Sequence, residues 1–153
     1  MQTRTRFSFL DIFRIIGGLI FLNALLSYTF TGGSTWGYRG KWIDTRFLSH
    51  SMRGYPQRQF SMTDLQQSIQ EGKYYLVING HVFDVGANAA MYSKSSRYSI
   101  FIGQDCSRAF VTGCFDCPCS EKFSDLPNGE KEIGKWHLFY NSHNRYWQVG
   151  ILH

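Results

Sequence analysis

Residues 73–85 read KYYLVINGHVFDV, two β-rich runs joined by Asn79-Gly80. Asn-Gly is strongly favoured at the centre of a type I′ turn, because both central residues of that turn have a positive φ. The flanking Val, Ile, Phe and Tyr residues are typical of strands that pack against a core. The stretch therefore predicts an antiparallel β-hairpin.

A helix is predicted immediately before the hairpin. Ser61 stands three residues ahead of Asp64, a spacing that resembles a capping box. Gly72 follows the apolar pattern and marks the end of the helix, because glycine readily takes the left-handed conformation found after a last turn.

A short helix, a longer helix and a strand are predicted after the hairpin. QDCSRAFVTG (104–113) reads as the short helix, with Asp105 as its N-cap. GEKEIGKWHLFYNSHNRYWQVGIL (129–152) predicts a helix to about Asn141 and then a short apolar strand. The expected fold class is α+β, in one small domain over residues 60–153.

A long apolar run precedes this domain. Between Ile12 and Phe30 the only charge is Arg14. A helix of that length covers about 28 Å at about 1.5 Å per residue, close to the hydrocarbon thickness of a bilayer. We expect a transmembrane anchor over residues 12–31, after a basic N-terminal tail over residues 1–11.

Two other interpretations of the apolar run agree less well with the sequence. A signal peptide shares the basic start, but SYTFTGGSTWGY (27–38) contains no clean small-x-small cleavage site. A buried helix of a soluble protein would need a core large enough to surround it, which the remaining chain hardly provides. The sequence therefore favours a retained anchor.

Residues 32–59 are rich in Gly, Ser and Arg and show no sustained period, so we expect a juxtamembrane linker. Trp36, Tyr38 and Trp42 are placed as an interfacial aromatic belt. Basic residues flank the apolar run almost equally, so charge does not decide its orientation: Arg4, Arg6 and Arg14 precede it, and Arg39, Lys41 and Arg46 follow it.

The bulk composition is basic and rich in aromatic residues, with a net charge of +5 and 17% Phe, Trp and Tyr. Many of the positive charges lie in the first 60 residues around the apolar run and form no basic stripe in the domain. This distribution indicates a membrane flank, and we expect no nucleic-acid partner. The aromatic excess suits a membrane interface or a pocket for a flat ligand.

The four cysteines lie close together in the sequence, with three of them in CFDCPC: Cys106, Cys114, Cys117 and Cys119. A structural zinc site normally uses two separated pairs, and no second pair is present. The spacing favours reduced cytosolic thiols, with a local disulfide or a metal site as the alternatives.

Known catalytic motifs are missing from the sequence. It contains no P-loop, no dinucleotide-binding fingerprint and no zincin motif, and Ser107 lacks the glycines of a nucleophile elbow. His81 follows the hairpin glycine, where a half-exposed turn residue is more common than a metal ligand. We therefore expect a protein that is not an enzyme by itself.

Three segments of the domain carry a family resemblance. LVINGHVFDV (76–85) is followed by a spaced tyrosine pair in MYSKSSRYSIF (91–101), then by FIGQDCSRAF (101–110), and RYWQVGIL (145–152) closes the domain. In this order they resemble the cytochrome b5-like haem/steroid-binding family, in its membrane-associated progesterone receptor branch and of the membrane-anchored fungal type. The resemblance covers residues 60–153, and a preceding single anchor is usual in that branch.

The resemblance implies a haem site built on tyrosines. The chain has no His-Pro-Gly-Gly turn of the kind that carries a haem-ligating histidine in true cytochromes b5. The branch uses one tyrosine phenolate, and Tyr98 matches it as the axial ligand to the iron of haem b. Tyr92 matches the second tyrosine, which hydrogen-bonds near the iron or a propionate. Arg145 stands where the family has Lys, and Tyr146 matches the adjacent tyrosine.

The chemistry of the expected site is reasonable by itself. Phenolate is a hard anionic ligand that favours ferric iron. A neighbouring cation favours the ionised phenol, and Lys94, Arg97 or Arg145 could supply it. The other interpretation of Tyr92 and Tyr98 is that they are core anchors under the loop.

Two segments depart from the family pattern. SKSSR (93–97) replaces a Gly-Pro-x-Gly loop, so the pre-set turn is lost although the spacing of the tyrosines is kept. FDCPCSEKFSDLPNGEK (115–131) has no counterpart, and we expect an exposed insertion there.

Three functions remain open from the sequence. The first is a single-pass haem-binding module, with a sterol as a further ligand. It would be a non-catalytic partner or regulator of membrane haem-thiolate monooxygenases and sterol or lipid metabolism at the endoplasmic reticulum, with a mitochondrial membrane as the alternative. The second is a haem-free interaction module, an accessory subunit of a membrane protein complex. The third is a small redox or metal protein that works through Cys114, Cys117 and Cys119.

Overall fold

The computed structural model describes residues 8–53 and 58–153. These residues belong to two compact units, with the boundary between Arg39 and Gly40. Arg4, Arg6 and the rest of the expected N-terminal tail up to residue 7 lie outside the described residues.

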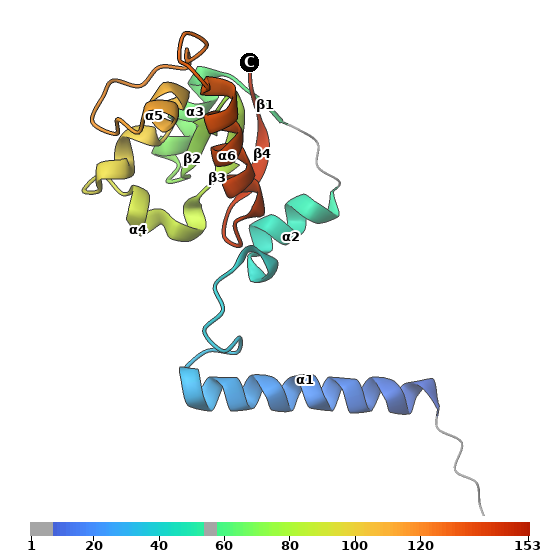
Figure 1. The fold of residues 1–153 in the computed structure, drawn as a ribbon. Coiled ribbons are helices and arrows are strands. Elements are labelled where there is room, and N and C mark those ends of the chain that lie inside the picture. The colour runs from blue at the N-terminus through green and yellow to red at the C-terminus, as the bar shows by residue number, and fades with distance from the viewer. Residues whose placement is uncertain (1–7, 54–57) are drawn as a thin grey trace, which may run out of the picture. The chain divides into compact units, whose positions relative to one another are not determined.

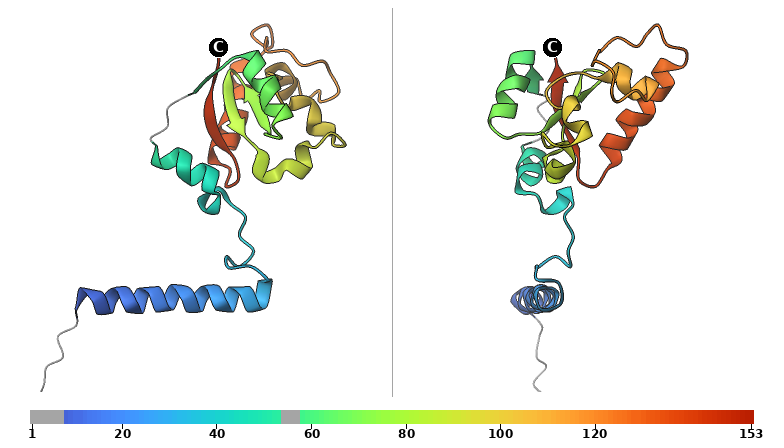
Figure 2. Two further views of the ribbon diagram at one scale, coloured as in Figure 1. Left: turned by 180° about the vertical axis from the view of Figure 1, so that it is seen from behind. Right: turned by 90° about the vertical axis from the view of Figure 1, so that its left-hand side faces the viewer.

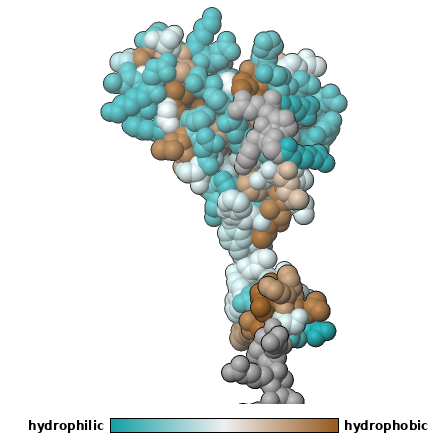
Figure 3. Space-filling view, turned by 90° about the vertical axis from the view of Figure 1, so that its right-hand side faces the viewer, coloured by the Kyte–Doolittle hydropathy of each residue, from teal (hydrophilic) through white to brown (hydrophobic). Residues whose placement is uncertain are grey.

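The first unit contains one long helix, α1 (Phe9–Thr31). Ser8 and Asp11 form a capping box at its start, and Gly32 ends it with a φ of 71°. The apolar helix expected at residues 12–31 is therefore present and begins three residues earlier. Its length and mean hydropathy of 1.9 are sufficient to cross a membrane, and apolar side chains gather on its surface (Figure 3).

The polar residues of α1 are paired by the segment that follows the helix. Ser27 Oγ donates to the Gly33 carbonyl at 2.5 Å and accepts the Trp36 backbone N–H at 2.6 Å. The Trp36 indole N–H donates to Asn23 Oδ1 at 3.1 Å. These bonds give hydrogen-bond partners to the Ser27 hydroxyl and the Asn23 side-chain oxygen, because an unpaired polar group in apolar surroundings would cost free energy.

The second unit is built on a four-stranded sheet with the order β1-β4-β3-β2 (Figure 1). β1 and β4 are parallel, and the other neighbours are antiparallel. The strand bounds are β1 (Arg58–Phe60), β2 (Tyr75–Ile78), β3 (His81–Asp84) and β4 (Trp147–Leu152). Asn79 and Gly80 have φ values of 50° and 74°, which confirms the predicted type I′ hairpin between β2 and β3.

Helices cover both faces of this sheet. The right-hand view of Figure 2 shows α3 on one side and α5 and α6 on the other. The bounds are α2 (Thr45–Met52), α3 (Met62–Gln70), α4 (Ala89–Tyr92), α5 (Ser107–Thr112) and α6 (Gly129–Ser142), with 3-10 helices at Lys41–Ile43, Gly86–Asn88 and Arg97–Phe101. The predicted helices after residue 60 are confirmed, and the capping box at Ser61 has both of its hydrogen bonds.

Alternation along the hairpin creates two cores. Leu76, Ile78 and Phe83 point to the α6 face and join the larger cluster, which includes Tyr92, Phe101, Phe110 and Tyr140. Val77 and Val82 point to the α3 face and pack with Phe60 and Leu65. Because successive strand residues face opposite sides, one hairpin supplies both clusters.

Asp105, the expected N-cap of α5, lies one position before the residue that occupies the N-cap, Cys106. Asp105 accepts the Ser107 backbone N–H at 2.9 Å, and it also accepts the Gly80 N–H at 2.9 Å. Ser107 Oγ accepts the Asn79 N–H at 2.7 Å. The start of α5 therefore satisfies the amides of the hairpin turn.

Part of the expected linker over residues 32–59 has regular structure. It contains α2 and the first two residues of β1, whereas no secondary structure was expected there. Phe47 of α2 is buried against Trp147, with ring centroids 5.4 Å apart. The helix is short and its stability comes from this long-range packing, so the sequence pattern alone did not reveal it. Pro56 of this segment lies outside the described residues.

The expectation of reduced thiols is wrong for this structure. Cys106 pairs with Cys119 and Cys114 pairs with Cys117, with Cα atoms 4.4 and 5.5 Å apart. The segment 115–131 is consequently tied to α5, and its Phe123 is buried in the larger core. Part of the segment that was expected to be an exposed insertion therefore packs into the core of the domain.

Candidate functional site

An aromatic cavity of about 310 Å³ lies on the α6 face of the sheet. Its walls come from α4, the 3-10 helix Arg97–Phe101, α5, α6 and the start of β4. The described residues that line it are Asn88, Met91, Tyr92, Tyr98, Phe101, Phe110, Phe115, Trp136, Phe139, Tyr140, His143 and Tyr146. Nine of these twelve residues are Phe, Tyr or Trp, so the aromatic excess seen in the sequence is concentrated at this cavity.

The two tyrosines of MYSKSSRYSIF enter the cavity with different exposure. Tyr92 ends α4 and is 5% exposed, whereas Tyr98, in the 3-10 helix Arg97–Phe101, is 37% exposed. Their ring centroids lie 6.4 Å apart. Tyr92 is therefore a wall residue of the cavity and Tyr98 stands at its rim.

Serine hydroxyls shape the loop between these tyrosines. Ser96 Oγ donates to the Met91 carbonyl and accepts the Tyr98 backbone N–H at 3.3 Å. Ser93 Oγ donates to the Ala90 carbonyl at 3.1 Å. No residue of this described loop has a positive φ, so it does not need glycine. Side-chain bonds to the backbone thus replace the turn that Gly-Pro-x-Gly would form.

A buried hydrogen bond joins two of the phenols. The Tyr92 and Tyr140 hydroxyl oxygens lie 3.1 Å apart. Burial raises the pKa of Tyr92 far above its ordinary value and, as the main cause, raises the pKa of Tyr140 to about 12. Both phenols are therefore neutral hydrogen-bonding groups at neutral pH.

Tyr146 completes the inner wall. The Asn88 amide donates to its hydroxyl at 3.1 Å, and its ring stacks on His143 and on Tyr140 with centroids 4.0 and 5.4 Å apart. Burial, and then the charges of Arg145 and Lys41, lower the pKa of His143. His143 is therefore a neutral aromatic partner at neutral pH.

The structure brings Tyr92, Tyr98 and Tyr146 together but leaves the expected cations outside. No Lys or Arg is among the described residues that line the cavity. Arg97 points to Asp116 at 3.3 Å on the surface, and Lys94 is exposed. Arg145 is half-buried, and its backbone N–H donates to His143 Nδ1 at 3.1 Å. Arg145 is thus next to the lining residues His143 and Tyr146 but is not itself among the described residues that line the cavity.

The other metal candidates have structural roles. His81 Nδ1 lies 3.0 Å from the Gln148 amide nitrogen, and its ring packs on His137. All four cysteines are disulfide-bonded. Among the residues that the structure describes, no group of three or more His, Cys, Asp or Glu side chains is placed to hold a metal ion.

Sequence reasoning missed the contribution of α6. Trp136, Phe139, Tyr140 and His143 all line the cavity, and their spacing of three or four residues places them on one side of the helix. That spacing is visible in the sequence and could have indicated an aromatic face. The hydrogen bond to Tyr92 spans 48 residues and had no local signal.

The comparisons with known proteins agree with this geometry. Residues 61–137 match the family model described as cytochrome b5-like heme/steroid binding domain. This match covers α3, the hairpin, the tyrosine loop and most of the cavity wall.

Two curated proteins and one solved structure are also similar to this chain. Human neuferricin is 41% identical over 68 residues, which are 43% of this chain and 26% of that protein. Human membrane-associated progesterone receptor component 2 is 32% identical over 102 residues, 62% of this chain and 45% of that protein. The chain thus spans less than half the length of either curated relative. The solution structure of a candidate steroid-binding protein from Arabidopsis superimposes with a TM-score of 0.54 and 25% identity, covering 63% of this chain and 98% of that one.

Proposed function

The chain belongs to the cytochrome b5-like heme/steroid binding domain family, and from this premise we propose that it is a membrane-anchored module that binds haem b. The observation that carries the proposal is the aromatic cavity with Tyr98 at its rim and two neutral phenols behind it. The apolar helix α1 would serve as the anchor, and residues 60–153 as the haem-binding domain.

The residues present fit a haem by their chemistry. Flat aromatic walls suit a macrocycle, and the volume of about 310 Å³ lies within the range of small-molecule sites, about 300–1,000 Å³. The polar groups of this lining include the hydroxyls of four tyrosines, the Asn88 amide and the His143 imidazole. When bound, haem would supply a ferric centre held by one hard anionic ligand, for which phenolate ligation is chemically suited.

Burial supports Tyr98 as the axial ligand. An anionic ligand must lose its proton, and the high pKa of Tyr92 and Tyr140 opposes that loss. Tyr98 is more than a third exposed and stands at the rim of the cavity, so its hydroxyl has no such buried hydrogen-bond partner among the described residues. Tyr92 would then serve as a hydrogen-bond donor inside the site, Tyr146 would be part of the wall that holds the cofactor, and Arg145, beside Tyr146 in the chain, would be a further cofactor-binding residue.

The proposed role of the module is binding and regulation, without catalysis of its own. Two relatives differ in name but share the domain, and one of them is named as membrane-associated. We place the chain at the endoplasmic reticulum, with a mitochondrial membrane as the alternative. There it would act on membrane haem-thiolate monooxygenases and on sterol or lipid metabolism, and a sterol would be a second ligand, in keeping with the family description.

A haem titration of the full chain in detergent tests the proposal. We expect a high-spin ferric visible spectrum that Tyr98→Phe abolishes and that Tyr74→Phe, a half-buried tyrosine outside the cavity lining, leaves intact. Tyr92→Phe should keep the uptake and shift the spectrum, because it removes a hydrogen bond and not the ligand.

Absence of uptake at micromolar haem would contradict the proposal. The same fold would then act as the haem-free accessory subunit of a membrane protein complex. Uptake that Tyr98→Phe does not change would keep haem binding and reject the assignment of the ligand.

A further inference from the structure

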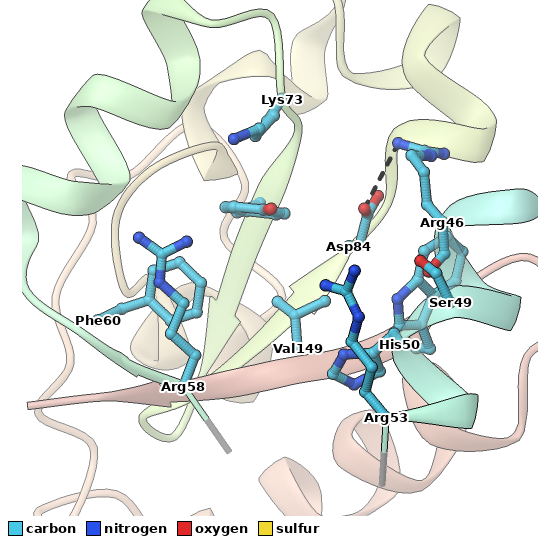
Figure 4. A pocket seen from close by; sticks show the side chains of 11 residues that line it. Arg46, Ser49, His50, Arg53, Arg58, Phe60, Lys73, Asp84 and Val149 are labelled. Atoms are coloured by element: carbon cyan, nitrogen blue, oxygen red, sulfur yellow. Dashed lines mark hydrogen bonds and ion pairs between the residues drawn. The ribbon is translucent and has the colours of Figure 1, made fainter. Parts of the chain in front are cut away.

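A second hollow, of about 500 Å³, lies on the α3 face of the sheet, where its lining residues Phe60, Tyr75 and Val149 belong to the smaller core cluster. Figure 4 shows the side chains that line it. We name it the cationic cleft. Four basic residues from three segments line it: Arg46 and Arg53 from α2 and its C-terminal end, Arg58 from β1 and Lys73 from the turn after α3. The cleft and the aromatic cavity share no lining residue among the residues described.

The four cations differ in how firmly they are paired. Arg46 binds Asp44 at 2.7 Å and Asp84 at 3.5 Å, and Lys73 binds Glu71 at 2.5 Å. The guanidinium groups of the other two basic residues are less closely paired with carboxylates, and they lie on opposite sides of the cleft.

Arg53 and Arg58 are those two groups. Arg58 is 4.0 Å from Asp64 at the limit of an ion pair, and it lies over the ring of Phe60. Arg53 has no ion-pair partner within the described ranges 8–53 and 58–153. Figure 4 shows both side chains directed into the hollow. A bidentate acceptor such as phosphate matches guanidinium groups held in this way.

The floor of the cleft is not basic. Tyr75 and Val149 contribute apolar surface between the cations, and the buried rings of Phe60 and Trp147 lie beneath it. Asp84, which is buried, is held by Arg46 and by the Gly86 N–H at 2.8 Å. The carboxylate therefore offsets Arg46 and leaves the charge of Arg53 and Arg58 facing the hollow. Such a site suits an anion attached to an apolar body.

We propose that the cationic cleft binds the phosphate group of an anionic membrane lipid. Arg46 follows the end of α1 by 15 residues, a stretch that reaches at most about 50 Å when fully extended. If α1 lies in a bilayer, the cleft is tethered within reach of the lipid headgroups. Juxtamembrane basic clusters are attracted to anionic lipid surfaces, and the apolar floor adds a contact for the glycerol and first methylene groups.

Calorimetric titration of the full chain in non-ionic detergent tests the proposal. The probes are dihexanoyl phosphatidic acid, inorganic phosphate and dihexanoyl phosphatidylcholine. We expect binding of phosphatidic acid that exceeds binding of inorganic phosphate, and no binding of phosphatidylcholine. Arg53→Gln combined with Arg58→Gln should weaken the binding of phosphatidic acid by at least about tenfold, because hydrogen bonds to charged groups are lost.

Two matched variants separate the cleft from general charge. Lys122→Gln with Lys131→Gln removes the same charge from exposed sites outside the cleft and should leave binding unchanged. Arg53→Lys with Arg58→Lys keeps the charge and removes the bidentate fork, so it should bind with intermediate affinity.

Three outcomes would overturn the proposal. Unchanged binding of phosphatidic acid in the Arg53→Gln, Arg58→Gln variant would show that the lipid does not bind in the cleft. An equal loss of binding in the Lys122→Gln, Lys131→Gln variant would show that the effect depends on net charge alone. Inorganic phosphate that binds as tightly as phosphatidic acid would assign the cleft to a soluble anion. Haem uptake is a separate readout on the other face of the sheet, so neither result depends on the other.

Discussion

Tyr92 and Tyr98 are chemically the same residue in different surroundings. Six positions apart, one is enclosed by Tyr140 and Tyr146 and the other stands at a solvent-facing rim. Enclosure keeps the first phenol neutral, since its charged form would be poorly solvated. Burial of single side chains, and not their spacing, therefore assigns different roles to the pair.

Tyr140→Phe should show how much the buried hydrogen bond between Tyr92 and Tyr140 contributes to the stability of the fold. The substitution leaves the Tyr92 hydroxyl without its partner, and we expect the free energy of unfolding to fall by about 1–3 kcal/mol. Urea unfolding of the full chain in detergent measures it. Tyr92→Phe combined with Tyr140→Phe should cost less than the sum of the single variants, because no buried hydroxyl then remains unpaired. Additive losses would contradict the assignment.

The histidines on α6 and after it predict a pH dependence. Burial lowers the pKa of His143 and His137 below the value of 6.5 that an unfolded chain has. The unfolded state then binds more protons as the pH falls through 6.5, so the free energy of unfolding should decrease from pH 7.5 to pH 5.5. Denaturation at both pH values measures this. The dependence should weaken in His143→Gln, and a dependence of opposite sign would reject the explanation.

At the scale of elements, the β2–β3 hairpin and the start of α5 stabilise each other. The turn residues Asn79 and Gly80 direct their amides outward, where Ser107 and Asp105 accept them at 2.7 and 2.9 Å. The Asp-x-Ser sequence at the start of α5 therefore accepts hydrogen bonds from the amides of the hairpin turn as well as from an amide of its own helix.

Ser107→Ala tests this contact between elements. Ser107 is fully buried, and its loss leaves the Asn79 N–H without an acceptor. We expect a loss of about 1–3 kcal/mol in the free energy of unfolding, measured by urea unfolding. Ser124→Ala, in the exposed part of the segment before α6, is the control and should change stability little. Equal effects of the two variants would show that the contact does not stabilise the fold.

At the scale of the whole molecule, one sheet separates two candidate binding sites. The aromatic cavity is on the α6 face and the cationic cleft is on the α3 face. Both depend on residues that alternate along the same strands: Phe83 joins the larger core and Asp84 lines the cleft. A ligand could therefore occupy one face while the other remains accessible.

The paired cysteines predict which side of a membrane the domain faces. Disulfides persist in oxidising compartments such as the lumen of the endoplasmic reticulum and are rare in the cytosol. We expect a maleimide reagent to modify Cys106, Cys114, Cys117 and Cys119 only after reduction, and the domain to resist protease added outside intact microsomes. Lysis of the microsomes before protease addition is the control. Cysteines that react without reductant would contradict the pairing.

Local chemistry in the sequence was sufficient for several features. The Asn79-Gly80 turn, the capping box at Ser61 and the apolar helix α1 each depend on residues close together in the chain. Their physical causes, the φ preference of glycine, a side chain bonded to its own helix and a run of apolar residues, are all visible in the sequence. The family resemblance also identified the tyrosine loop.

Only the tertiary structure decided the surroundings of those residues. The Tyr92–Tyr140 bond, the Arg46–Asp84 pair and the contact of Phe47 in α2 with Trp147 join residues that are 48, 38 and 100 positions apart. Sheet formation brings such residues together, and no local preference encodes which of them meet. The sequence therefore indicates which tyrosines are expected to form a site, whereas the tertiary structure decides which phenols are buried, which cysteines pair and which arginines face a cleft.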